Sequence, residues 1–326
     1  MSRLMHVARG PYSPPVARQE ISATSADGSR LHIEVHGPEG APTVVLAHGW
    51  TCSTAFWGAV TRDLAEEYRV VVYDQRGHGR SPAPRADGYS TQALADDLEA
   101  VLDATLEPGE RAVLAGHSMG AMTLMAAADR PTVLARAAAA VLCSTGSSRL
   151  LGESRVVPLS SAGLRARVHR ALLGSSAPLG PVTPLARKIL KYATMGRDAS
   201  PEMVDACARI VHACPRKVRA AWAHVLAELD LDSGVRELSV PTVVVAGTAD
   251  RLTPVSHARR IVEALPDSAG LVELEGLGHM TPVEAPDEVA GVIRRLVREH
   301  LAPASAHEPA DRAGATKTDT SEKEAS

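Results

Sequence analysis

A serine between two glycines is the part of this sequence with the clearest chemistry. The segment Gly116-His117-Ser118-Met119-Gly120 follows the apolar run 111–115 and precedes the Ala- and Met-rich segment 121–128. This pattern predicts a strand, a sharp turn and a helix, with glycines where a Cβ would collide with the strand or the helix. The hydroxyl would be exposed at the turn, facing the positive end of the helix dipole, where negative charge develops during acyl transfer. Ser118 is therefore a candidate nucleophile.

A serine nucleophile needs a base to take its proton and a carboxylate to orient that base. Such groups gather at the carboxyl ends of strands in open α/β sheets, in the chain order serine, acid, histidine. The apolar run 242–246 leads into a loop that holds Asp250, and the run 271–275 leads into a loop that holds His279. We therefore expect Asp250 and His279 to complete a triad with Ser118.

Other residues compete for these two roles. Asp250 could instead cap the helix that Pro254 opens, because aspartate is favoured at helix N-termini. Asp230 and Asp232 precede the strand at 242–246 and are expected at the far edge of the sheet. Of the 13 histidines, His279 alone follows both a strand and the acid loop in the required order. Position along the chain thus favours Asp250 and His279.

The elements that would position these residues alternate along the chain. Apolar or alternating patterns predict strands at 20–24, 31–36, 43–47, 69–73, 111–115, 137–143, 242–246 and 271–275, the first two joined as a hairpin. Helical spacing predicts helices at 57–68, 94–106, 121–128 and 288–300. Strands that are apolar on both faces and alternate with helices predict an α/β fold with a mostly parallel, doubly wound sheet.

The alternation breaks once, between the strands at 137–143 and 242–246. Arg-rich helical stretches at 164–173, 184–195 and 201–229 predict an inserted helical cap at 147–233. The sheet domain would then comprise 19–146 and 234–301, after a loose arm at 1–18. The tail at 302–326 has no Val, Leu, Ile, Met or aromatic residue, so we expect it to be disordered.

Composition excludes several classes of protein. A net charge of −3 over 326 residues argues against nucleic-acid binding, and no apolar run approaches the roughly 20 residues of a membrane-spanning helix. The N-terminus lacks the apolar core of a signal peptide, so we expect a cytoplasmic protein. The four cysteines form no C-x-x-C pair, and Cys207 and Cys214, seven apart on one predicted helix, are interpreted as core residues. We expect no cofactor and no metal.

Five motifs in order make the chain resemble the α/β-hydrolase superfamily over most of residues 20–300. They are His48-Gly49-Trp50, the 74–81 loop, the 116–120 turn, the 247–254 acid loop and Gly278-His279. The resemblance implies that the backbone N–H groups of Trp50 and Met119 form an oxyanion hole. It also implies that the 74–81 loop braces the oxyanion loop, with His48 a structural hydrogen-bonding residue.

The resemblance is to serine-nucleophile, esterase- and lipase-like members with a helical cap, and it implies an acyl-enzyme mechanism. A cap rich in Leu, Val and Ala favours a small to medium apolar acyl group, so the predicted function is hydrolysis of a small-molecule carboxylic ester. The cap arginines are interpreted as solvated helix faces rather than as an anion site. C–C bond hydrolysis, perhydrolysis, acyl transfer on the same triad, and silent binding of a small molecule stay open as alternatives.

Overall fold

The computed structural model describes residues 10–173, 175–177 and 179–301, so the predictions for 1–9 and for the tail at 302–326 lie outside the described residues. Its centre is an eight-stranded sheet in the order β1-β2-β4-β3-β5-β6-β7-β8. The strands are β1 (Gln19–Thr24), β2 (Arg30–His36), β3 (Thr43–Ala47), β4 (Arg69–Asp74), β5 (Ala112–His117), β6 (Ala137–Cys143), β7 (Thr242–Gly247) and β8 (Ser268–Leu274). Each coincides with a predicted strand to within a few residues.

The sheet is parallel except at one edge. β1 pairs with β2 and β2 with β4 in antiparallel register, and every other pairing is parallel. The β1–β2 hairpin turns at Gly28, whose φ of 82° suits glycine, while Asp27 accepts a hydrogen bond from the Ser29 N–H at 2.9 Å. Because the strands from β3 onward run in the same direction, the loops that follow them all lie at the carboxyl ends of the strands, on the same side of the sheet.

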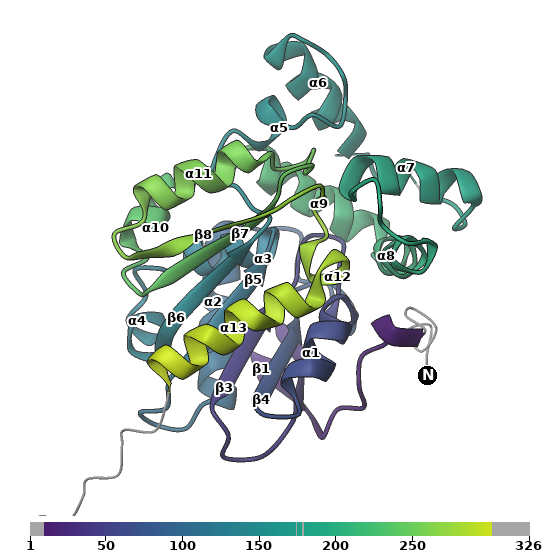
Figure 1. Ribbon diagram of the computed structural model, residues 1–326. Coiled ribbons are helices and arrows are strands. Elements are labelled where there is room, and N and C mark those ends of the chain that lie inside the picture. The colour runs from purple at the N-terminus through teal and green to yellow at the C-terminus, as the bar shows by residue number, and fades with distance from the viewer. Residues whose placement is uncertain (1–9, 174, 178, 302–326) are drawn as a thin grey trace, which may run out of the picture.

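Helices cover both faces of this sheet (Figure 1). One buried apolar cluster joins the sheet to α1 and α13, and a second joins its other face to α2, α3, α10 and α11. Two apolar layers on opposite faces of a parallel sheet confirm the doubly wound α/β prediction. The helices outside the insertion, α4 and α12 included, are α1 (Gly58–Leu64), α2 (Thr91–Thr105), α3 (Met119–Ala126), α4 (Pro131–Arg136), α10 (Asp232–Glu237), α11 (Val255–Ala264), α12 (Thr281–Glu284) and α13 (Pro286–His300).

Five helices stand between β6 and α10, where the sequence predicts a cap at 147–233. Figure 1 shows them beyond one edge of the sheet, with α6 and α7 towards the outside. The buried Trp222 of α9 anchors the insertion, since its indole N–H donates to the Arg76 carbonyl at 3.3 Å. The inserted helices are α5 (Leu150–Glu153), α6 (Ala162–Leu173), α7 (Pro184–Thr194), α8 (Pro201–Ala213) and α9 (Arg216–Ala227).

Two local predictions need correction. The helical stretch at 201–229 is two helices, because Pro215 has no N–H and holds Cys214 in an extended conformation with ψ of 128°. Cys214 therefore lies just past the end of α8, although it and Cys207 are both buried as predicted. The described part of the arm is also not loose: Arg62 donates a hydrogen bond to the Ser13 carbonyl, and Tyr12 packs against the core beside α1.

No helix among the described residues is long and apolar enough to cross a membrane.

Candidate active site

Ser118 occupies a strained turn between β5 and α3. Its φ of 51° and ψ of −114° are rare for a residue with a side chain, and such strain persists only where the surroundings enforce it. A Cβ at Gly116 would lie 2.4 Å from the Gly120 carbonyl, and one at Gly120 would lie 2.1 Å from the Ala47 carbonyl oxygen. Both glycines are therefore sterically required, as the sequence predicts.

Asp250 and His279 meet across two neighbouring strand ends. The Nδ1 atom of His279 lies 2.8 Å from Oδ2 of Asp250, and each residue is only 4% exposed. The other carboxylate oxygen accepts hydrogen bonds from the N–H groups of Leu252 (2.8 Å) and Thr253 (3.0 Å). Asp250 thus orients His279 and also closes its own turn. The helix that Asp250 would cap in the alternative interpretation begins only at Val255.

His117 connects the serine turn to the histidine loop. Its ring lies edge-on to the His279 ring with centroids 5.0 Å apart, and its Nε2 is 2.8 Å from the His279 carbonyl oxygen. Burial lowers the pKa of His117 well below its usual value, so the ring is neutral and serves as a local support. No hydrogen bond within the described part of the chain joins the Ser118 hydroxyl to His279, a contact that often tightens only with substrate bound.

Two backbone N–H groups close to Ser118 in the chain or in space have no hydrogen-bond partner among the described residues. Met119 is the first residue of α3, where N–H groups have no intrahelical partner, and neither its N–H nor that of Trp50 is hydrogen-bonded to any described residue. A Cβ at Gly49 would lie 3.2 Å from the Ser118 Cβ, so the turn that carries Trp50 lies directly against the serine. This arrangement suits an oxyanion hole.

The loop at 74–81 holds that turn in place. The Nε2 atom of the buried His48 accepts from the Gln75 N–H at 3.0 Å, and its Nδ1 donates to the Gly49 carbonyl at 2.7 Å. The Asp74 carboxylate accepts from the Thr54 N–H at 2.8 Å. Burial lowers the pKa of His48 to about 3, so this ring is a neutral structural group, in line with the sequence-based expectation.

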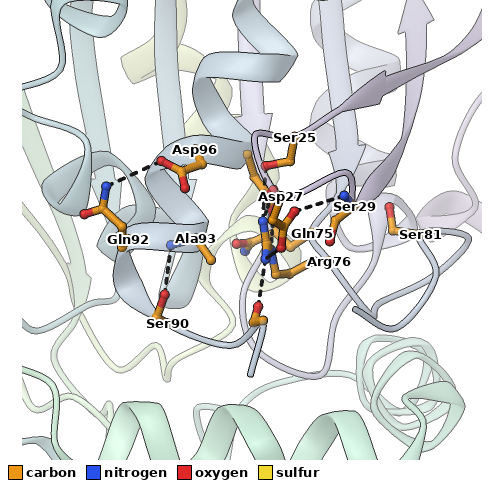
Figure 2. A network of polar contacts seen from close by, with 12 residues as sticks. Ser25, Asp27, Ser29, Gln75, Arg76, Ser81, Ser90, Gln92, Ala93 and Asp96 are labelled. Carbon is orange, nitrogen blue, oxygen red and sulfur yellow. Dashed lines mark hydrogen bonds and ion pairs between the residues drawn. The ribbon is translucent and has the colours of Figure 1, made fainter. Parts of the chain in front are cut away.

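Arg76 fixes the same loop to the rest of the sheet domain. The buried guanidinium makes two hydrogen bonds to Asp97 of α2, at 2.5 and 2.7 Å. It also reaches Asp27 at 2.9 Å and Ser25 at 3.2 Å in the β1–β2 turn (Figure 2). The loop that braces the turn at Trp50 is therefore anchored on two sides by one residue.

Glu284 is a partly buried carboxylate for which the sequence predicts no role. Its oxygens accept from the N–H groups of Gly278 (3.2 Å) and Met280 (3.1 Å), on either side of His279. They also accept from the Gly196 N–H at 2.6 Å, just after α7. Burial raises the pKa of Glu284, while the backbone donors oppose that rise. Its one signal in the sequence is an acid in the largely apolar run 280–285.

Asp232 does not lie where the sequence predicts. Its carboxylate accepts from the hydroxyls of Ser147 (2.6 Å) and Ser148 (3.1 Å), which follow β6. It is therefore near the carboxyl ends of the strands and not at the far edge, because the chain returns from the cap there before α10 leads back to β7. The Asp232 carboxylate is hydrogen-bonded to these two serines, whereas the His279 ring is hydrogen-bonded to Asp250.

One group of possible metal ligands lies away from this site, on β1 and β2. Ligand atoms of Glu20, His32 and Glu34 lie within 4.8 Å of one another. Glu20 forms an ion pair with Arg80 at 2.5 Å, and Glu34 contacts His32 at 3.2 Å. Burial would raise the pKa of Glu34, but hydrogen bonds from two histidines lower it to about 2. These contacts explain the cluster as an ion-pair network on one face of the hairpin.

Comparison with known proteins supports the same interpretation of the fold. The model of the Alpha/beta hydrolase family matches residues 44–292. The chain belongs to this family. A putative carbamate hydrolase, RutD, of Variovorax paradoxus is 32% identical over 295 residues, which cover 85% of this chain and 97% of the relative.

Two further proteins are similar to this chain, one in sequence and one in structure. The 3-oxoadipate enol-lactonase 1 of Acinetobacter baylyi is 24% identical over 287 residues, or 85% of this chain and 97% of that protein. The structure of a thermophilic esterase from Thermogutta terrifontis superimposes with a TM-score of 0.69 at 25% identity, covering 86% of this chain and 98% of the esterase. The chain is an α/β hydrolase, as the resemblance implied.

Proposed function

We propose that this α/β hydrolase cleaves a small-molecule carboxylic ester through Ser118, His279 and Asp250. The observation that carries the proposal is the buried hydrogen bond between Asp250 and His279, at the strand ends beside the strained Ser118 turn. Because Asp250 occupies Nδ1 of His279, the imidazole has its Nε2 available as a base. This is the geometry that a serine nucleophile requires.

The reaction proceeds in two steps. His279 takes the Ser118 proton as the serine oxygen attacks the acyl carbon, and the N–H groups of Trp50 and Met119 stabilise the tetrahedral oxyanion. The carbon–oxygen bond to the leaving alcohol breaks, and His279 gives that alcohol its proton. Water, deprotonated by His279, then attacks the acyl-serine ester. The bond between the acyl carbon and the Ser118 oxygen breaks, the acid is released, and His279 returns the proton to the Ser118 oxygen.

The surroundings of Ser118 favour a small to medium apolar acyl group. The Trp50 indole donates to the Arg219 carbonyl of α9 at 3.1 Å, so a cap helix lies over the proposed oxyanion turn. The end of α7 lies over the histidine loop, where a Cβ at Gly278 would be 2.5 Å from the backbone of Met195. Two cap helices therefore border the site closely. The names of an esterase and an enol-lactonase among the similar proteins also denote ester cleavage.

Carbamate hydrolysis is the second candidate. It is favoured by the 32% identity to a putative carbamate hydrolase along 97% of that relative. The same three residues would act, because a carbamate also presents a carbonyl carbon with an oxygen or nitrogen leaving group. Silent binding would show as absence of both activities, whereas a perhydrolase or an acyltransferase would still cleave the ester through the same acyl-enzyme.

Hydrolysis of p-nitrophenyl esters of graded chain length tests the proposal. We expect the wild-type protein to prefer short to medium acyl chains, and Ser118→Ala to lose at least about 10³-fold in kcat. Equally slow hydrolysis of every ester by both proteins would contradict it. An aryl carbamate assayed in parallel separates the two candidates, because a higher kcat/KM for the carbamate than for the esters would favour carbamate hydrolysis as the function.

A further inference from the structure

The outer part of the cap is cationic. Between Ser154 and Arg197, hereafter the outer cap segment, the sequence has eight Lys or Arg residues and no Asp or Glu, although the whole chain has a net charge of −3. Arg187 forms an ion pair with Asp205 at 2.6 Å, and Arg170 lies 3.9 Å from Glu228. The other cations of the segment have no carboxylate partner within the described residues, so the segment keeps most of its positive charge.

The same segment exposes large apolar side chains. In α7, Leu185 is 66% exposed, Ile189 is 59% exposed and Tyr192 is 47% exposed. Their spacing of four and three residues places them in one stripe along the helix, and α7 packs on α8 (Figure 1). Leu164 and Leu179 of the outer cap segment are exposed as well. A cluster of this kind marks a surface that binds something.

The combination of charge and apolar surface selects the partner. A second copy of the chain would bring like charges together, and a small soluble anion would not cover an apolar helix stripe. An anionic lipid surface supplies both phosphate charge for the cations and acyl chains for the stripe. We propose that the outer cap segment docks on an anionic lipid surface, with Leu185, Ile189 and Tyr192 entering the headgroup–acyl boundary.

This surface adjoins the candidate site. The Arg251 guanidinium, next to Asp250 in the chain, lies 4.7 Å from the centroid of the Tyr192 ring. At the end of α7, the Thr194 carbonyl accepts from the His279 N–H at 2.7 Å. A docked cap would therefore hold the rim of the site near the lipid. The inference goes beyond the proposed function and stands without it, because docking requires no turnover.

Vesicle sedimentation tests the proposal with the full-length protein. Neutral phosphatidylcholine vesicles are compared with vesicles that contain about 30 mol% phosphatidylglycerol. We expect binding to the anionic vesicles at about 0.05 M NaCl, and at least tenfold weaker binding to neutral vesicles or at about 0.5 M NaCl. Absence of binding to anionic vesicles at low salt, or equal binding to neutral ones, would overturn the proposal.

Matched variants locate the docking surface. The double variant Leu185→Ser/Ile189→Ser and the single variant Lys188→Glu should each weaken vesicle binding about tenfold. Leu134→Ser on α4 and Arg298→Glu on α13 alter exposed residues elsewhere and should bind as the wild type does. Circular dichroism melts establish that each variant is folded.

Two results with these variants would overturn the proposal. One is unchanged vesicle binding by a folded Leu185→Ser/Ile189→Ser protein. The other is a concentration-dependent dimer that this double variant abolishes, in a protein that does not bind vesicles. The second result would make another copy of the chain the partner of the stripe.

Discussion

The strand-end loops and the outer cap segment of this hydrolase are held in opposite ways. At the strand ends, Asp250 and His279 are buried and each is fixed by several hydrogen bonds. In the outer cap, Leu185 and Ile189 are mostly exposed, and the helix that carries them packs mainly on another cap helix. The groups proposed for catalysis are therefore fixed in position, whereas the surface proposed for docking is exposed.

One carboxylate also links the two regions. Glu284 binds N–H groups on both sides of His279, and it also binds the Gly196 N–H at the end of α7. Movement of the cap at Gly196 would therefore displace His279, the proposed base.

The largest effect is expected from Asp250→Asn. The amide keeps the shape of the side chain but favours the wrong histidine tautomer, so kcat should fall by about 10⁴-fold while the thermal midpoint changes little. Ester hydrolysis and a thermal melt measure the two quantities. Asp232→Asn is the matched control, because Asp232 also accepts two side-chain hydrogen bonds near the strand ends. Near-normal turnover in Asp250→Asn, or an equal loss in Asp232→Asn, would move the role to another residue.

A smaller effect is expected from Glu284→Gln at the junction. The amide NH₂ would face backbone N–H donors, so the His279 turn should loosen and kcat should fall about 10- to 100-fold with little change in KM. The exposed Glu288→Gln on α13 is the control. A lower thermal midpoint with unchanged kcat would show that Glu284 supports the fold and does not position His279.

Acid should weaken the strand-end scaffold. Burial lowers the pKa of His48 to about 3 and that of His78 to about 4, so below about pH 6.5 the unfolded chain binds more protons than the folded one. Their contribution to stability is therefore present above that pH and is lost as the pH falls. Burial raises the pKa of Asp74 to about 6, and this shift has the opposite sign and offsets part of the loss.

We predict a free energy of unfolding at least about 2 kcal/mol lower at pH 5 than at pH 7.5, because the lowered pKa values of the buried His117 and His257 act in the same direction as those of His48 and His78. Urea unfolding at the two pH values measures it. Equal or greater stability at pH 5 would contradict the assignment of these histidines as neutral buried groups.

Thiol labelling compares the two regions directly. All four cysteines are buried, and burial raises the pKa of each thiol, so labelling requires local opening. Cys207 and Cys214 in the cap should react with a maleimide about tenfold faster than Cys52 and Cys143 in the sheet domain. Peptide mass spectrometry measures the rates. Equal rates, or faster labelling in the sheet domain, would remove the proposed difference in rigidity.

Much of the fold was predictable because its signals are local. A strand buried on both faces, such as 43–47 or 137–143, is almost entirely apolar, and each of these is a strand of the sheet. The positions of Asp250 and His279 follow from the same logic, since loops after parallel strands converge at one edge. The hydrogen bond between them is therefore confirmed by the structure, while their catalytic role stays a proposal.

What could not be predicted depends on contacts between distant segments. Glu284 matters because Gly196, far away in the chain, donates to it, and no periodicity marks such a pair. The position of Asp232 depends on the path by which the chain leaves the cap, which composition does not encode. The break at Pro215 is different, because proline is a local signal that ends a helix. The prediction of a helical stretch over 201–229 did not take this signal into account.

The most direct test of the proposed nucleophile is covalent trapping with an alkyl fluorophosphonate, followed by peptide mass spectrometry. We predict stoichiometric phosphonylation of the peptide at Ser118, parallel loss of ester hydrolysis, and no adduct in a folded Ser118→Ala protein. Full loss of hydrolysis with the adduct on another residue, or hydrolysis that persists after Ser118 is fully modified, would contradict the assignment.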